Sequence, residues 1–303
     1  MPASPLVTRF APSPTGRLHL GHVASMLHVW GLAARHGAQL GIRIEDHDRQ
    51  RCRPEYQDDL RKDLDWLGLR PLSGGGWSIQ SQQEDRYRKA LEMLRARGLV
   101  YACRCSRKAI EFGMDAPEGR YPGHCRDLRL PEGDDTSLRL RLPDEAVEFH
   151  DARHGRQSQL PARQCGDFVL RDRHGNWTYQ FAVVVDDIHD GINWIIHGDD
   201  LLASTGRQLL LAKLLGRTLP LRFYHHPLIV NPDGTKLSKS ESAAPIGRLR
   251  GQGISAGEVL ARAARLSGLN PEAGMLDVED LATLLAPADA MVASVAPYEF
   301  SSS

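Results

Sequence analysis

The stretch that decides the fold runs from Arg9 to His22 and reads R-F-A-P-S-P-T-G-R-L-H-L-G-H. An apolar run from Leu6 to Phe10 ends at two prolines and a glycine, and a helical pattern begins at Leu20. The order predicts a strand, a tight turn and the start of a helix. Backbone N–H groups at a helix start are unpaired and carry the positive end of the helix dipole, so this turn suits the phosphates of a nucleotide.

Three residues at this helix start are candidates for nucleotide binding. His19 and His22 could hold the phosphates of ATP, and Gly21 leaves space for a base or sugar to approach the backbone. The alternative is an ordinary helix cap with two surface histidines.

A second motif follows a turn at Asn231 to Gly234 and reads Lys236-Leu237-Ser238-Lys239-Ser240. Lysines flanked by hydroxyls can bring mobile positive charge to a transferring phosphoryl group, although such a loop alone is most often only solvated. Together, H-L-G-H and K-L-S-K-S resemble the paired motifs of class I aminoacyl-tRNA synthetases. The longer string R-F-A-P-S-P-T-G is similar to the glutamyl and glutaminyl branch.

Composition indicates a folded protein with a sizeable core. Of 303 residues, 41% are hydrophobic and 25% are charged, which excludes a disordered chain. No apolar run is long enough to span a membrane, and Met1 to Leu6 has neither a basic leader nor an apolar signal core. We therefore expect a cytoplasmic enzyme that contacts no membrane and is a monomer.

Five cysteines, an odd number, argue against a disulfide framework.

Positive charge is concentrated in the middle of the chain, although 38 basic residues balance 38 acidic ones overall. Between Arg95 and Arg129 there are eight Lys or Arg against four acidic residues, whereas four arginines and eight acidic residues follow Ser240. Phosphate contacts need local positive charge, so the middle segment is the better candidate for contacting RNA.

The first hundred residues alternate strand-like and helix-like patterns. Helices are predicted at Leu20–Arg35, Pro54–Leu67 and Gln83–Arg97, with a buried strand at Gln39–Glu45. This order predicts an α/β fold with a parallel sheet whose carboxyl ends form a crevice that holds the first motif. We assign residues 1–100 to the first half of a Rossmann-like nucleotide-binding domain.

Acidic residues follow the second strand, in Ile44-Glu45-Asp46-His47-Asp48. Such a cluster could bind an amino group or a metal, or it could simply cap the next helix. In the glutamyl branch the corresponding segment helps bind the amino acid, so the resemblance implies that Glu45 binds the substrate ammonium.

Clustered cysteines predict a metal site in a segment with little core of its own. Cys103, Cys105 and Cys125 could bind one zinc ion, with His124 or Tyr121 as the fourth ligand. His124 is favoured chemically because imidazole is a commoner zinc ligand than phenolate, and free cysteines are the alternative. The segment is also similar to the zinc site of the glutamyl-Q tRNA(Asp) synthetases, which implies Tyr121. We expect Cys52 and Cys165, outside the pattern, to be buried.

The rest of the chain completes the predicted architecture. A zinc-containing, acceptor-type insertion is assigned to residues 101–166, the second half of the catalytic domain to 167–235, and the lysine loop with a short helical tail to 236–303. Strands are predicted at Leu138–Leu142, Ala146–Phe149, Gly166–Leu170, Ile192–His197 and Arg222–Val230, and helices at Ser204–Leu215, Ser255–Leu266 and Val278–Leu285. We expect serine and threonine to cap the first of these helices.

The resemblance implies roles for individual residues. His19, His22 and Lys239 are the catalytic residues, and Gly21 and Lys236 join them in binding ATP. The amino acid is bound by Arg9, Ala11, Ser13, Glu45, Tyr179 and His197. The family has an arginine where this chain has His197, in H-G-D-D-L, which places more of the carboxylate pairing on Arg9 and leaves a glutamine-like substrate open.

The implied reaction joins glutamate to RNA. Glutamate attacks the α-phosphorus of ATP, with magnesium escorting the triphosphate, and the glutamyl group then passes to queuosine at the first anticodon position of tRNA(Asp). Only 63 residues follow Ser240, too few for the large anticodon-binding part of a glutamyl-tRNA synthetase, which favours this transfer. The alternatives are a truncated enzyme that charges a tRNA 3′ end, a nucleotidyltransferase acting on a small molecule, and a non-catalytic paralogue that binds RNA or protein.

Overall fold

A central sheet organises the chain in the computed structural model, which describes residues 5–106, 109–110, 120–229, 244–271, 274–293 and 295–300. In one part of the sheet, β1 (Val7–Phe10), β2 (Gln39–Ile44) and β3 (Trp77–Ile79) run parallel. In the other part, β10 (Arg222–His226) pairs in parallel with β9 (Trp194–Gly198) and β6 (Val147–Asp151), and β7 (Gly155–Gln159) closes the edge antiparallel to β6. The backbone N–H of Asn193 donates to the Val7 carbonyl and places the two parts side by side.

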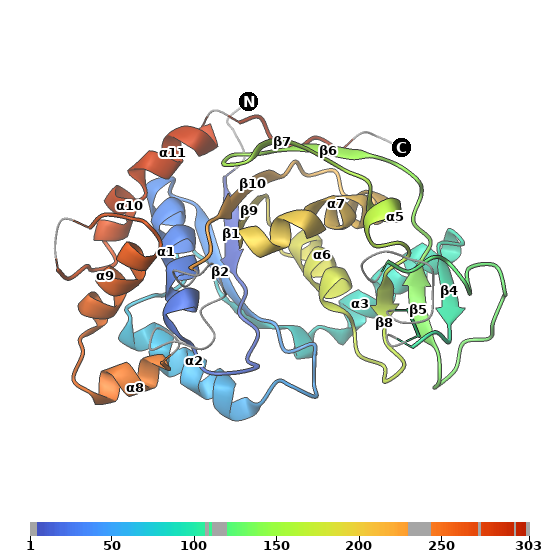
Figure 1. Cartoon of the computed structure of the whole chain (residues 1–303), viewed down its shortest axis with the longest axis horizontal. Coiled ribbons are helices and arrows are strands. Elements are labelled where there is room, and N and C mark those ends of the chain that lie inside the picture. Colours follow the sequence, from blue (N-terminus) through green and yellow to red (C-terminus); the bar gives the residue numbers. More distant parts are fainter. Residues whose placement is uncertain are drawn as a thin grey trace.

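Helices cover both faces of this sheet (Figure 1). One face carries α1 (Leu20–Arg35), α2 (Pro54–Trp66), α9 (Ala256–Leu266) and α10 (Asp280–Leu284), and the other carries α3 (Glu84–Ala96), α6 (Tyr179–His189) and α7 (Thr205–Leu214). Trp30 centres the first core and Phe181 the second, and both side chains are fully buried. The sheet therefore separates two apolar cores, as expected for an α/β protein. The remaining short elements are η1 (Gln80–Gln82), α5 (Pro161–Gln164), η3 (Asp199–Ser204), α8 (Ile246–Gly251) and α11 (Ala286–Ala293).

A smaller antiparallel sheet lies to one side of the central one (Figure 1). It contains β4 (Val100–Cys103), β5 (Ser137–Leu140) and β8 (Val169–Arg171), with Val100 opposite Leu140. The strands β6 and β7 lie in sequence between β5 and β8, yet they extend the central sheet. The chain thus leaves the small sheet, completes the edge of the large one and returns.

Most predicted elements are confirmed within one to three residues, and α1 matches its prediction at both ends. Three details were wrong. The side chain of Ser204 makes no capping hydrogen bond at α7, and the Thr205 hydroxyl lies instead beside Leu201 and His225. Cys52 and Cys165 are only half-buried, since Cys52 lies in the loop before α2 and Cys165 follows the short helix α5 at the edge of the second core. The predicted strand Arg222–Val230 ends earlier, at His226, because Pro227 has no N–H group to continue the ladder, and Val230 lies outside the described residues.

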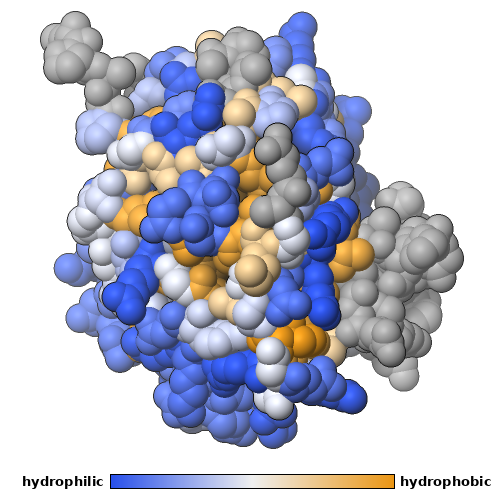
Figure 2. Space-filling view, turned by 90° about the vertical axis from the view of Figure 1, so that its left-hand side faces the viewer, coloured by the Kyte–Doolittle hydropathy of each residue, from blue (hydrophilic) through white to orange (hydrophobic). Residues whose placement is uncertain are grey.

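The surface over the C-terminal helices is mixed in character. Figure 2 shows hydrophilic residues there, with hydrophobic ones reaching the surface in patches between them. Met275 is the most exposed of the large apolar side chains that the structure describes, at 61%. None of the helices in the described part of the chain combines the length and the apolar character needed to cross a membrane.

Candidate active site

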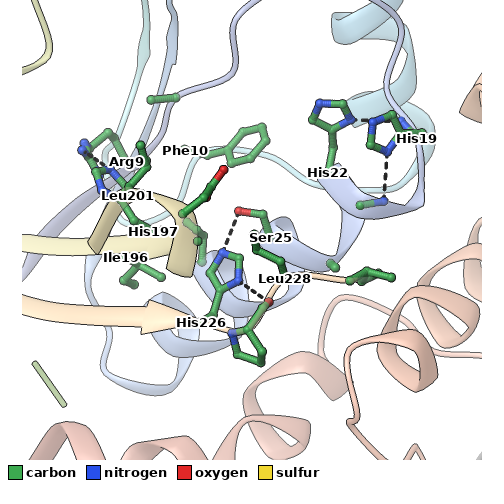
Figure 3. Close-up of a pocket in the computed structure, with 18 of the residues that line it drawn as sticks. Arg9, Phe10, His19, His22, Ser25, Ile196, His197, Leu201, His226 and Leu228 are labelled. Atoms are coloured by element: carbon green, nitrogen blue, oxygen red, sulfur yellow. Dashed lines mark hydrogen bonds between the residues drawn. The ribbon is translucent and has the colours of Figure 1, made fainter. Parts of the chain in front are cut away.

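A cavity of about 390 Å³ opens at the carboxyl ends of β1, β9 and β10, against the start of α1 (Figure 3). This is the crevice that the parallel topology predicts. Its walls combine the first motif with residues from the second half of the chain. The lining includes Arg9, Phe10, Ala11, His19, Gly21, His22, Ser25, Tyr179, Ile196, His197, Gly198, His226 and Leu228.

Two histidine rings cap the start of α1. The backbone N–H of Gly21 donates to Nδ1 of His19 over 3.1 Å, and the backbone N–H of His19 donates to Nδ1 of His22 over 3.2 Å. The two ring centroids lie 4.0 Å apart. A Cβ atom at Gly21 would lie 2.9 Å from the His19 ring, so glycine is needed here for the capping ring as well as for an approaching ligand.

These hydrogen bonds fix where each ring carries its proton. Because Nδ1 accepts in both rings, the neutral form carries its hydrogen on Nε2. Burial lowers the pKa of His19, and burial followed by the charge of His19 lowers the pKa of His22 to about 3. At neutral pH both rings are therefore uncharged N–H donors at the wall of the cavity.

Arg9 lies across the cavity from this helix start, and Figure 3 shows it beside His197. Its Nε and Nη2 atoms donate to the two carboxylate oxygens of Asp187 over 2.8 and 3.0 Å. The same Nη2 atom lies 2.8 Å from Nε2 of His197. The pKa of Asp187 is lowered: burial alone would raise it, but the charges of Arg9 and Arg43 outweigh burial. Asp187 is not among the sequence-predicted site residues, although an acidic pair directly after a buried apolar run was a signal for it.

The other predicted amino-acid ligands divide into two groups. Ala11 and Tyr179 line the cavity, and burial raises the pKa of the Tyr179 hydroxyl. Glu45 and Ser13 lie outside this lining. The Glu45 carboxylate is buried 3.2 Å from Arg43, and burial raises its pKa while Arg43 opposes the shift.

Polar residues in and behind the cavity wall support it, and none of them is a sequence-predicted site residue. The buried carboxylate of Asp151 accepts a hydrogen bond from Nδ1 of His225 at 2.7 Å and from the His225 backbone N–H. His226 contacts the Pro227 carbonyl through Nδ1 and the Ser25 hydroxyl through Nε2. The adjacent histidines within the predicted strand Arg222–Val230 were a signal, but their partners lie 74 and 201 residues away in the chain.

The three cysteines come together as predicted, at the end of β4 in the small sheet. The sulfur atoms of Cys103, Cys105 and Cys125 all lie within 4.8 Å of one another. The Tyr121 hydroxyl is 3.4 Å from the Cys103 sulfur and accepts from the backbone N–H of Cys125, whereas His124 is exposed. Burial raises the pKa of Cys105 to about 12, so a bound cation would be needed to hold the thiolate form. Three thiols and a phenol in this arrangement could hold a metal ion.

The predicted lysines of the second motif, Lys236 and Lys239, lie outside the described residues. Their roles therefore stay predictions.

Known proteins resemble this chain over most of its length. A family model described as tRNA synthetases class I (E and Q), catalytic domain, matches residues 5–280. The chain is 42% identical over 283 residues to the glutamyl-Q tRNA(Asp) synthetase of Symbiobacterium thermophilum, covering 87% of each chain. Its counterpart from Nitratidesulfovibrio vulgaris is 38% identical, covering 93% of this chain and 95% of the relative.

Longer proteins match over only part of their length. The glutamate–tRNA ligase of Frankia casuarinae is 38% identical, and the match covers 81% of this chain but 52% of the ligase. Among solved structures, the glutamate-tRNA synthetase of Elizabethkingia anophelis superposes with a TM-score of 0.75 at 24% identity, covering 92% of this chain and 65% of that one. At this identity the superposition shows a shared fold alone.

Proposed function

The chain belongs to the glutamyl-Q tRNA(Asp) synthetase family, and from this premise we propose that it activates glutamate with ATP and transfers the glutamyl group to queuosine in tRNA(Asp). Members of this class I family are ATP-dependent ligases, and the family match, together with the shared fold, confirms the predicted synthetase fold. The observation that carries the proposal is near full-length similarity to several such synthetases, combined with a cavity lined by the first motif.

In the first step an oxygen of the glutamate α-carboxylate attacks the α-phosphorus of ATP, and the bond to pyrophosphate breaks. The neutral Nε2–H groups of His19 and His22 donate to the phosphate oxygens of ATP. These hydrogen bonds stabilise the negative charge that shifts onto the leaving pyrophosphate. The start of α1 adds its dipole to this stabilisation. ATP enters with magnesium, and Lys236 and Lys239 would offset charge on the transferring group.

Amino-acid binding occupies the opposite side of the cavity. Arg9 and His197 would contact a carboxylate of the substrate, and Tyr179 and Ala11 would border its carbon chain. Glu45 would bind the ammonium, provided that it exchanges part of its contact with Arg43, and Ser13 would approach from the turn. In the second step a hydroxyl of the queuosine cyclopentenediol attacks the activated carbonyl, and AMP leaves.

The test locates the product. The protein is incubated with labelled glutamate, ATP, magnesium and tRNA(Asp) that contains queuosine, followed by ribonuclease digestion, and tRNA(Asp) without queuosine is the control. Label in the anticodon fragment of the first tRNA alone supports the proposal. Label at the 3′ end would instead make the chain a charging enzyme, and label on neither RNA would contradict both.

We also propose that the cluster binds one zinc ion through Cys103, Cys105, Cys125 and Tyr121. The donor set is typical of a structural zinc site, and the ion would order a segment whose buried apolar cluster is small. Elemental analysis should find about one zinc per chain. Cys103→Ser should lose the metal and Cys165→Ser, outside the cluster, should keep it, whereas equal metal content in both variants would contradict the site.

A further inference from the structure

The segment that follows β10 lies beside the cavity without the support of the sheet. The strand ends at His226, and no backbone-to-backbone hydrogen bond joins Pro227, Leu228 or Ile229 to any other residue in the described part of the chain. These three residues nevertheless line the cavity, together with residues of α1. Side chains must therefore hold them in place.

His226 makes the polar contacts that fix this segment on α1. Figure 3 shows its ring bonded to the Ser25 hydroxyl of α1 and to the carbonyl of Pro227, at 3.0 and 2.9 Å. A carbonyl only accepts, so Nδ1 carries the hydrogen, and Nε2 of the neutral ring accepts from the Ser25 hydroxyl. Burial lowers the pKa of His226, which agrees with a neutral ring. The ring thus joins the helix to the chain that leaves β10.

Apolar contacts support the same segment. Ile229 packs against Ala24 of α1, and both side chains are buried. Leu228 occupies the space above Gly198 of β9, where an added Cβ atom would lie 2.7 Å from Cδ2 of the leucine. Such contacts are not directional, whereas the two hydrogen bonds of His226 fix a distance and a direction.

The His226 ring has no polar atom left for a ligand. Both of its nitrogens are bonded, and the residue is only 2% exposed. The ring of His28 stacks on it at 4.6 Å, with 2° between the two planes. Any effect of His226 on substrate binding must therefore act through the residues that it holds.

We infer that His226 is a positioning residue for ATP, and that it sets the spacing between α1 and the segment Pro227–Ile229. The inference rests on the proposed function, in which the start of α1 holds the phosphates. Ala24, Leu228 and Ile229 provide apolar lining beside this helix, and the base is the flat, least polar end of ATP. A change in the spacing misplaces the base relative to the phosphates.

The experiment measures the KM values for ATP and for glutamate in pyrophosphate exchange. His226→Leu fills a similar volume but makes neither hydrogen bond, so it should raise the KM for ATP about three- to tenfold and leave that for glutamate within about twofold. His226→Gln should recover most of the loss, because its amide oxygen reaches as far as Nε2 and can accept from Ser25. His226→Asn reaches only as far as Nδ1 and should not. His150→Leu, at an exposed position of β6, is the control and should change neither value.

A double-mutant cycle tests whether His226 acts through Ser25. Ser25→Ala alone should raise the KM for ATP by a factor similar to that of His226→Leu. In the His226→Leu background the same change should add less than about twofold, because the hydrogen bond is already absent. Two independent contacts with ATP would instead multiply their effects. Thermal unfolding checks that each variant is folded, and if His226→Leu is not, His226→Asn takes its place in the cycle.

Four results would overturn the inference: an unchanged KM for ATP in His226→Leu, an equal rise in both KM values, equal losses in the glutamine and asparagine variants, or multiplied effects in the double variant. If the natural chain exchanges no pyrophosphate, the proposed function fails separately. The same variants are then compared by equilibrium binding of labelled ATP with magnesium, and absence of ATP binding by the natural chain would also overturn the inference.

Discussion

His19 and His22 act as neutral donors because each ring is held by a backbone N–H group at its Nδ1 atom. The spacing of the two residues produces this arrangement, since positions three apart at a helix start lie one above the other. A charged imidazolium would also bind phosphate, but the low pKa of His22 excludes it at neutral pH. The site stabilises charge by orientation rather than by protonation.

Substitution of His22 tests this role. His22→Ala should lower the rate of glutamate-dependent pyrophosphate exchange by about 10- to 100-fold, because a hydrogen bond to a charged oxygen is lost. In His22→Gln the amide nitrogen can replace Nε2, so this matched variant should recover much of the rate. The rate should also show no step near pH 6.5 that depends on residue 22. Equal losses of the exchange rate in the two variants would mean that the N–H donor of residue 22 does not determine the rate.

At the scale of the elements, α1 depends on close packing as well as on its cap. A Cβ atom at Gly31 would lie 2.6 Å from the Leu281 carbonyl oxygen and 2.9 Å from Cγ of Leu285. Glycine therefore allows α10 to lie directly against α1. Glycine lowers the helix propensity of α1, but it permits contact between two helices that are distant in sequence.

Gly31→Ala should destabilise the protein. Overpacking costs about 1–3 kcal/mol, which exceeds the gain of about 1 kcal/mol in helix propensity. Gly251→Ala is the matched control, because Gly251 ends α8 with open space around its Cα atom. Urea unfolding should show a lower free energy of unfolding for the first variant and no loss for the second. A stabilised Gly31→Ala would show that α10 moves away at little cost.

The sequence predicts an element well where its apolar residues follow one clear periodicity, as in α1. It predicts poorly where tertiary contacts determine the secondary structure or the partners of a residue. The apolar run from Phe181 to Val185 fits a strand as well as a buried helix by its sequence alone, and the structure makes it part of α6. The cysteine cluster was recognisable because its ligands are close in sequence. The ion pair of Arg9 with Asp187 was not, since 178 residues separate the partners and only the fold brings them together.

At the scale of the whole molecule, buried histidines couple stability to pH. His28 is 2% exposed, stacks on His226 at 4.6 Å, and has no hydrogen-bond partner at either ring nitrogen within the described chain. Burial, followed by the charge of His226, lowers the pKa of His28 to about 3. The unfolded chain binds a proton at this residue near pH 6.5 and the folded chain does not, so stability falls as the pH drops from 6.5 toward 3.

His28→Leu should weaken this dependence. Between pH 7.5 and 5.5, a histidine that stays neutral in the folded state costs about 1.4 kcal/mol of stability, and leucine removes that cost while keeping an apolar side chain. Urea unfolding at the two pH values should therefore show a smaller loss in His28→Leu, by about 1.4 kcal/mol, than in the natural chain. His174→Leu, at an exposed turn, should retain the natural dependence. If His28→Leu loses as much stability as the natural chain, the buried ring must already take up a proton in the folded state, and the stacked pair would have to tolerate a charge between α1 and β10.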